Sequence, residues 1–267
     1  MTAFSASSVK VHGHRGARAV LPENTIAGFE YAIEAGADFV ELDLAVTKDD
    51  VLVVSHDPVI NAKICTGGKP GAVIREMTFE ELQRYDCGSL RNPDFPRQKP
   101  VPGARIPSLD QVLELASRGD FVFNIETKIS ADKPQYTPTP EEYARMLLDA
   151  IRKHKIESRV RVQSFDFRTL HEMKKLAPEI PLAALYSGKP EDFAAIAREA
   201  GAGIAAPHLS LVTKARVDAA HAAGVPVVPW TANTPEEWDR LIEAGVDEII
   251  TDDPAGLIEH LKKRGVR

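Results

Sequence analysis

Two histidines and three carboxylates are the residues of this sequence that could best combine acid–base and metal chemistry. His14 and His56 each follow a short apolar run, and Glu41, Asp43 and Glu126 lie on two further runs. Imidazole titrates near neutral pH, so a pair of histidines can supply the acid and the base for one phosphoryl transfer. Taken singly, either histidine could equally be a hydrogen-bonded structural residue.

The three carboxylates are predicted to face the interior of a barrel. Side chains alternate between the two faces of a strand, so Glu41 and Asp43 share one face, and the same alternation turns Glu126 inward. Ionised carboxylates that converge in such an interior repel one another, and a hard divalent cation with oxygen ligands is the simplest way to offset this. The alternative is an ion-pair network with Arg15 and Lys128.

Other polar or aromatic residues near strand ends are weaker candidates for function. Trp230 could form a wall or a stacking platform for a substrate, although a Trp at the rim of a barrel often only packs. His12 is predicted to be a structural residue of the barrel interior. Asn24 is predicted to cap the first helix, and residues 251–254 are predicted to cap the last one.

A repeated junction between helix and strand organises the chain. A helical pattern ends in Ala-Gly and a short apolar run follows at residues 34–42, 199–206, 223–228 and 243–250. Glycine readily adopts the left-handed conformation that ends a helix, and the apolar run is typical of a buried parallel strand. Units of strand and helix in series predict an α/β fold.

Eight apolar runs alternate with helical patterns and predict a closed (β/α)8 TIM barrel. The predicted strands are residues 9–13, 39–45, 121–126, 160–164, 182–186, 203–206, 225–230 and 248–251. The predicted helices are residues 25–35, 109–117, 141–153, 167–176, 191–200, 214–223, 235–244 and 254–263. Because 267 residues match the usual size of such a barrel, we expect a single catalytic domain over residues 1–267.

One segment, residues 57–107, contains no unit of strand and helix and is predicted to be an insertion embedded in the barrel. It is rich in Pro, Gly and Asn, with a short helix expected at residues 78–85 and an extra strand before it at residues 51–55. It follows the second strand, which predicts a position at the barrel mouth, where such folds carry their active sites. Cys65 and Cys87 are too few for a disulfide framework and are expected to be plain thiols.

Composition and charge exclude several classes of protein. Hydrophobic residues make up 43% and charged residues 27%, as in globular proteins, and the net charge of −6 argues against a protein that coats nucleic acid or a membrane surface. No apolar run reaches the roughly 20 residues of a membrane span, and residues 1–8 lack the pattern of a signal peptide. We therefore expect a cytoplasmic protein that acts on a small molecule. The sequence does not indicate which oligomeric state it adopts.

Several short motifs, in order along nearly the whole chain, together resemble the glycerophosphodiester phosphodiesterase family. They are HRG at residues 14–16, PENT at 22–25, ELD at 41–43, SHD at 55–57, IPSL at 106–109, NIETK at 124–128, QSF at 163–165, WTAN at 230–233 and TDDP at 251–254. The combination is highly specific, although no single piece would be. The resemblance implies a (β/α)8 barrel with an inserted segment after the second strand.

The resemblance also implies a reaction that releases an alcohol and sn-glycerol 3-phosphate from a deacylated phospholipid. The free glycerol hydroxyl is implied to attack the phosphorus first, which gives a cyclic intermediate. The implied site has Mg²⁺ or Ca²⁺ held by Glu41, Asp43 and Glu126, His14 and His56 as general base and acid, and Arg15 and Lys128 as phosphate contacts. The family often carries Arg-Thr-Thr soon after the His-Asp pair, whereas residues 61–66 here are NAKICT, which leaves the headgroup preference open.

Two other functions are compatible with these residues. The same metal site could act on lysophospholipids, as in related enzymes of the phospholipase D type, and a long apolar lip on the insertion would favour that function. Residues 60–105 contain few apolar clusters of this kind. A barrel that binds anions without catalysis would turn over no phosphodiester and would hold no metal at its mouth.

Overall fold

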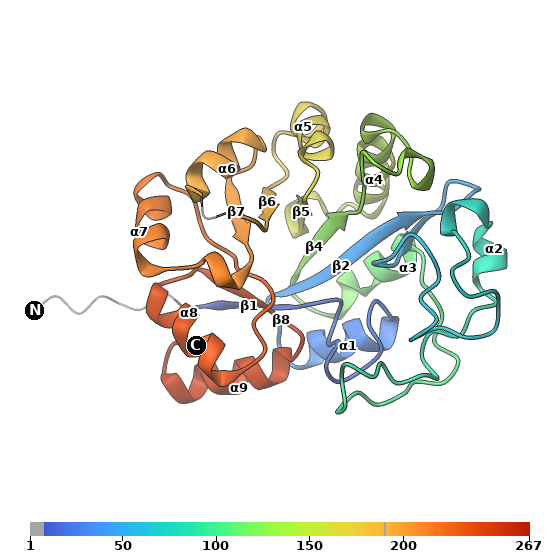
Figure 1. The fold of residues 1–267 in the computed structure, drawn as a ribbon, viewed down its shortest axis with the longest axis horizontal. Coiled ribbons are helices and arrows are strands. Elements are labelled where there is room, and N and C mark those ends of the chain that lie inside the picture. The colour runs from blue at the N-terminus through green and yellow to red at the C-terminus, as the bar shows by residue number, and fades with distance from the viewer. Residues whose placement is uncertain (1–7, 190) are drawn as a thin grey trace, which may run out of the picture.

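The computed structural model describes residues 8–189 and 191–267, and Figure 1 shows helices around the outside of a curved sheet. The strands are β1 (Lys10–Gly13), β2 (Phe39–Val46), β3 (Leu52–Val54), β4 (Val122–Thr127), β5 (Val160–Ser164), β6 (Leu182–Tyr186), β7 (Ile204–Pro207) and β8 (Glu248–Thr251). The helices are α1 (Ile26–Glu34), α2 (Phe79–Leu82), α3 (Leu109–Leu113), α4 (Pro140–His154), α5 (Phe167–Leu176), α6 (Phe193–Glu199), α7 (Lys214–Ala222), α8 (Pro235–Ala244) and α9 (Pro254–Arg264). The predicted α/β class is confirmed.

The strands form one sheet whose main path is parallel. Its order is β7-β6-β5-β4-β2-β1-β8, and β3 pairs antiparallel with β2 outside this path. In the register of β2 with β4, Asp43 lies beside Glu126, and in that of β4 with β5, Glu126 lies beside Gln163. Neighbours in register point to the same face of a sheet, so these three polar side chains gather in the barrel interior.

The seventh predicted strand, residues 225–230, is not a regular strand. It makes only isolated parallel bridges to β7, from Val227 to Ala205 and from Trp230 to His208. Pro226 and Pro229 lack the N–H that a continuous ladder needs. Backbone hydrogen bonds still join this segment to both β7 and β8. The N–H of Val228 donates to the oxygen of Ala205 over 2.8 Å, and the N–H of Ile250 donates to the oxygen of Pro229 over 3.0 Å. The segment therefore occupies the predicted place and closes the barrel.

The helices cover the sheet with apolar faces of helical period. In α4 the buried residues include Tyr143, Leu147 and Ile151, which are four positions apart and therefore lie on one face. This helix starts at a capping box between Thr139 and Glu142, which satisfies two of the free N–H groups of its first turn. Among the described residues, no helix combines the length and the apolar character that a membrane crossing requires.

The insertion has a small apolar cluster of its own, and its two cysteines form a disulfide. The cluster consists of Ala45, Val53, Ile60, Cys65, Ile74, Leu82, Tyr85, Cys87 and Ile106. The expectation of two plain thiols is wrong, because paired backbone hydrogen bonds between Thr66 and Asp86 bring Cys65 and Cys87 together. This contact joins residues far apart in sequence, so cysteine counting could not show it.

At the end of the barrel away from its mouth, a buried ion-pair network fills the interior. Glu248 of β8 accepts hydrogen bonds from His12 over 2.6 Å and from Arg161 over 2.5 and 3.0 Å. Burial lowers the pKa of His12, which fits a neutral ring that donates from Nε2. Burial alone would raise the pKa of Glu248, but His12 and Arg161 hold it well below its usual range. His12 thus has the structural place that the sequence predicted.

This network should make the fold sensitive to acid. The folded pKa of Glu248 lies below its unfolded value, so its contribution is fully present above about pH 4.5 and is lost as the pH falls towards the folded value. We expect Glu248→Gln to lower the free energy of unfolding by about 3 kcal/mol at pH 7, because Arg161 loses its buried partner. Urea unfolding at pH 7 and pH 3.5 measures the free energy of unfolding of both proteins. The difference between wild type and Glu248→Gln should be smaller at pH 3.5. Glu259→Gln, at an exposed residue of α9, is the control, and a gap independent of pH would contradict the prediction.

Candidate active site

The three carboxylates predicted to bind a metal lie together on the neighbouring strands β2 and β4. Glu41, Asp43 and Glu126 are all buried, and each offers an oxygen within 4.8 Å of the others. Asp43 and Glu126 are in register across two parallel strands, and Glu41 is two residues before Asp43 on the same face. The local pattern of the strands therefore produces the cluster.

Two cations, Arg15 and Lys128, lie against this cluster. Nε of Arg15 is 3.2 Å from Oδ2 of Asp43. Nζ of Lys128 is 3.2 Å from Oδ1 of Asp43 and 2.7 Å from Oε1 of Glu126. The ion-pair network that the sequence left as an alternative is thus present, but it does not balance the negative charge, because Arg15 also pairs with Glu23 at 2.8 Å.

The chemistry of the cluster fits a divalent cation. Burial raises the pKa of Glu126 to about 7, with Asp43 adding to the rise and Lys128 opposing it. Burial and the two neighbouring carboxylates raise the pKa of Glu41 well above its usual value. Burial would also raise the pKa of Asp43, but Lys128 and Arg15 hold it well below. Oδ1 of Asp43 is buried and, apart from its ion pair with Lys128, accepts no hydrogen bond from the described residues, so it has capacity to act as a ligand atom.

Both predicted catalytic histidines contact a carboxylate through the same ring nitrogen. Nδ1 of His14 is 2.5 Å from Oδ1 of Asp252, and Nδ1 of His56 is 2.9 Å from Oδ1 of Asp57. Within the described part of the chain, Nε2 of neither ring has a hydrogen-bond partner, which leaves this nitrogen for a ligand. Burial lowers the pKa of His14 although Asp252 opposes this, so its neutral form is favoured.

Asp252, the partner of His14, lies in the segment expected only to cap the last helix. Because β1 pairs in parallel with β8, the residues that follow the two strands, His14 and Asp252, are neighbours. Nδ2 of Asn233 donates to the other oxygen of Asp252 over 2.7 Å and fixes the carboxylate. The cap of α9 is Asp253. Finding Asp252 from the sequence would have required the pairing of the first strand with the last.

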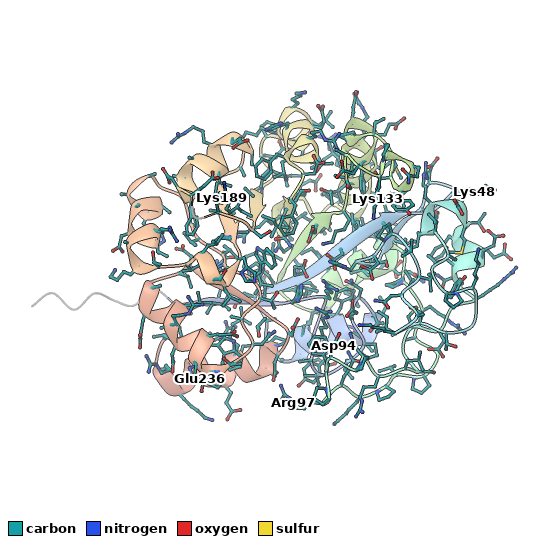
Figure 2. All side chains as sticks on the ribbon, in the orientation of Figure 1. Lys48, Asp94, Arg97, Lys133, Lys189 and Glu236 are labelled. Carbon is teal, nitrogen blue, oxygen red and sulfur yellow. A yellow bond between two sulfur atoms is a disulfide. The ribbon has the colours of Figure 1, made fainter. Side chains whose placement is uncertain are left out.

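One cavity of about 190 Å³ brings most of these groups together, and we call it the mouth cavity. It is lined by His14, His56, Glu41, Glu126, Arg15, Lys128 and Trp230 of the predicted site, and by Arg18, Gln163, Phe165, Leu185, Thr231 and Ile250. Figure 2 shows how densely side chains fill the space inside the ring of helices. Asp43 is the predicted site residue that does not line the cavity, and its carboxylate instead contacts Arg15 and Lys128, which do line it.

Trp230, which the sequence offered as a possible wall for a substrate, lines the mouth cavity. Its Nε1 donates to the backbone oxygen of Ala206 over 2.8 Å, which fixes the indole. Phe165 packs edge-on against it, with the ring centroids 5.2 Å apart, and this Phe is 44% exposed. The pair thus offers an apolar surface beside the charged groups.

The turn after β1 contains site residues that the sequence did not single out. Asn24, expected to cap the first helix, donates instead to Asp43 over 3.0 Å, and the cap of α1 is Thr25. Glu23 accepts from Arg18 over 2.7 Å as well as from Arg15, and so holds both guanidinium groups at the mouth. Glu23 and Asn24 belong to the PENT motif that carries part of the family resemblance, which was their signal in the sequence.

A chain of hydrogen bonds positions Glu41 from inside the barrel. Nε2 of Gln163 donates to Oε1 of Glu41 over 3.0 Å, and Nδ2 of Asn124 donates to Oε1 of Gln163 over 2.9 Å. These two bonds fix the orientation of the Gln163 amide, because its nitrogen must donate and its oxygen must accept. On the other oxygen of Glu41, the backbone N–H of Arg15 donates over 2.9 Å. Both oxygens are thus positioned before any metal binds.

Comparison with known proteins agrees with this geometry. A family model described as the glycerophosphoryl diester phosphodiesterase family matches residues 14–256. The chain is 36% identical over 256 residues to a glycerophosphodiester phosphodiesterase of Caldanaerobacter subterraneus subsp. tengcongensis, covering 96% of this chain and 98% of the relative.

Solved structures show the same fold. A putative glycerophosphoryl diester phosphodiesterase from Silicibacter pomeroyi superimposes with a TM-score of 0.90 at 31% identity, over 97% of this chain and 95% of the other. An Oleispira antarctica phosphodiesterase in complex with the product sn-glycerol-3-phosphate superimposes with a TM-score of 0.82 at 24% identity, over 96% and 97% of the two chains. The predicted TIM barrel is confirmed.

Proposed function

Because the chain belongs to the glycerophosphoryl diester phosphodiesterase family, we propose that it hydrolyses glycerophosphodiesters to an alcohol and sn-glycerol 3-phosphate with a divalent cation as cofactor. The observation that carries the proposal is the mouth cavity, where His14 and His56, each paired with an aspartate, meet a buried acidic cluster and two cations. The product bound in the Oleispira antarctica phosphodiesterase supports sn-glycerol 3-phosphate as the product here.

In this proposal the two histidines move protons. His14, whose neutral form is favoured by burial, takes at Nε2 the proton of the glycerol hydroxyl that attacks the phosphorus, and Asp252 stabilises the resulting imidazolium. His56 gives a proton to the departing alkoxide, and Asp57 orients its ring. Water then opens the cyclic phosphate with the roles reversed: His56 takes a proton from the water and His14 returns its proton to the glycerol oxygen, which yields sn-glycerol 3-phosphate. Two carboxylates thus prepare the two rings for one phosphoryl transfer.

The groups in and around the acidic cluster would stabilise the negative charge of the phosphate. Arg15, Arg18 and Lys128 line the mouth cavity and would neutralise the phosphate. Mg²⁺ or Ca²⁺ bound by Glu41, Asp43 and Glu126 would supply further positive charge for the developing negative charge on the phosphate oxygens.

The exposed surface favours water-soluble diesters over lysophospholipids. An enzyme that takes lysophospholipids needs apolar surface for an acyl chain. Among the described residues, Leu90 and Phe165 are the large hydrophobic side chains that are exposed, at 38% and 44%. Phe165 lines the mouth cavity and Leu90 does not, so they form no continuous apolar lip.

The test is a hydrolysis assay with a metal titration. Protein freed of metal with EDTA should release no sn-glycerol 3-phosphate from glycerophosphoglycerol, and Mg²⁺ or Ca²⁺ should restore release. Enzymatic oxidation of the sn-glycerol 3-phosphate reports the product and distinguishes it from free glycerol. Lysophosphatidylcholine is the comparison substrate, and faster choline release from it than from glycerophosphocholine would overturn the substrate class.

A further inference from the structure

We infer that a second cavity beside the mouth cavity holds the alcohol headgroup of the substrate, and that Lys133 in it selects polyol headgroups, above all those that carry a second phosphate. This inference rests on the proposed function. The second cavity, which we call the side cavity, has a volume of about 240 Å³. Its wall includes Ile129, Lys133, Tyr136 and Thr137, from the segment between β4 and α4. Figure 2 labels Lys133 near the end of β4.

The two cavities meet at groups assigned to the phosphate and to the leaving alcohol. His56 and Lys128 line both cavities. A phosphate held between them would direct one of its ester groups into each cavity. The mouth cavity takes its walls mainly from strand ends and suits the glycerol phosphate that all substrates share. The side cavity is built by a loop, as is common for the part of a site that sets specificity.

The charge of the side cavity disfavours a cationic headgroup. Lys128 and Lys133 contribute two ammonium groups to its wall, and none of the described residues that line it is a carboxylate. The acidic groups that offset Lys128, Asp43 and Glu126, contact it in the barrel interior and do not line the side cavity. Asp132 precedes Lys133 in sequence but does not line the cavity either.

Tyr136 could bind choline only if its ring face were open. Aromatic rings attract quaternary ammonium groups through cation–π contacts. Here Nζ of Lys133 lies over the Tyr136 ring, 5.8 Å from its centroid, so a choline would meet a positive charge where it needs a bare ring. Ser130 and Thr137, two hydroxyl-bearing residues, also line the side cavity, which adds polar character to its wall.

The experiment compares kcat/KM for four diesters of sn-glycerol 3-phosphate at one ionic strength. Their alcohols are methanol, choline, glycerol and glycerol that carries a second phosphate. Methanol is too small to reach the side cavity and reports the basic reaction. The enzymes are the wild type, Lys133→Ala, Lys133→Glu and, as a control, Lys189→Ala, which changes an exposed lysine after β6 (Figure 2).

We expect the phosphate-bearing polyol to be the best substrate and choline the worst. Lys133→Ala should lower kcat/KM for the phosphate-bearing polyol about fivefold, an effect that salt weakens, and leave the methyl diester unchanged. Lys133→Glu should reverse the order of that substrate and choline. Equal kcat/KM for all headgroups, or an equal loss of kcat/KM for the methyl diester in Lys133→Ala, would overturn this inference and leave the proposed function standing. If even the methyl diester is not hydrolysed, the proposed function fails and the inference falls with it.

Discussion

Replacing His14 or His56 with alanine should lower kcat for glycerophosphoglycerol by about 10² to 10⁴-fold at saturating metal, because each variant loses one proton transfer of the reaction. The acidic cluster that would bind the metal does not include either ring, so affinity for Mg²⁺ or Ca²⁺ should stay near that of the wild type. Steady-state kinetics and a metal titration of the same samples separate the two effects. Near wild-type hydrolysis by either variant would rule that histidine out as a catalytic group.

Two further variants test the reading of the histidine environments. His171→Ala, at an exposed residue of α5 away from the mouth cavity, should keep full activity. Asp252→Asn should lower kcat, because the carboxylate that stabilises protonated His14 is lost. Because burial lowers the pKa of His14, the acid limb of the pH–activity profile should lie below pH 6.5. Asp252 opposes this lowering, so Asp252→Asn should move the acid limb to lower pH. An unchanged acid limb would mean that another group sets it.

Glu126→Gln should abolish activation by metal while leaving the metal-free fold at least as stable as the wild type. Burial raises the pKa of Glu126 to about 7, so this carboxyl is already partly protonated at neutral pH without a metal. The glutamine amide has the same shape, keeps an oxygen for Lys128 and removes a repulsive charge. Thermal unfolding in EDTA and in Mg²⁺ measures both effects. At a Mg²⁺ concentration one hundred times Kd, the free energy of unfolding of the wild type should rise by about 2.7 kcal/mol, and that of the variant should rise far less.

Asp43→Asn is the matched comparison at the same cluster. Lys128 and Arg15 hold the pKa of Asp43 well below its usual value, so this group is ionised in the metal-free protein. Its loss should cost about 3 kcal/mol in EDTA, because buried Arg15 and half-buried Lys128 lose their shared partner. If Glu126→Gln were as destabilising as Asp43→Asn in EDTA, the cluster would be an ion-pair network rather than a metal site.

The raised pKa of Glu126 also sets a direction for pH. Its folded value of about 7 lies above the unfolded value, so the contribution of Glu126 to the stability of the metal-free wild type is fully present below about pH 4.5 and is lost as the pH rises to about 7, a loss that Glu126→Gln should not show. Protons and metal compete for the same oxygens, so metal affinity of the wild type should be lower at pH 6 than at pH 8.

Much of the metal cluster could be predicted because it depends on local periodicity. Side chains repeat every two residues along a strand, so Glu41 and Asp43 lie on one face. The strand at residues 122–127 places Glu126 in register with Asp43. His14, Arg15 and Lys128 follow strand ends, which meet at one edge of a parallel sheet. The barrel itself followed from the repeated junction of helix and strand.

Two of the errors arose where contacts join distant parts of the chain, and one arose from prolines within a predicted strand. The disulfide between Cys65 and Cys87 depends on how the insertion folds back on itself. The seventh strand was predicted as regular, yet Pro226 and Pro229 interrupt its ladder. Asn24 was assigned to the nearest helix, although its amide donates to a carboxylate of the next strand.

What the sequence by itself determined is the chemical inventory of the mouth and the strand positions that carry it, because strand periodicity and helix ends are local properties. What only the tertiary structure decided is how those groups are paired. Asp252 reaches His14 because the last strand lies beside the first, and Gln163 reaches Glu41 across the barrel interior. The pairing of β4 with β2 places the loop that carries Lys133 beside His56. Such pairings depend on distances through space between residues far apart in sequence, which no local pattern encodes.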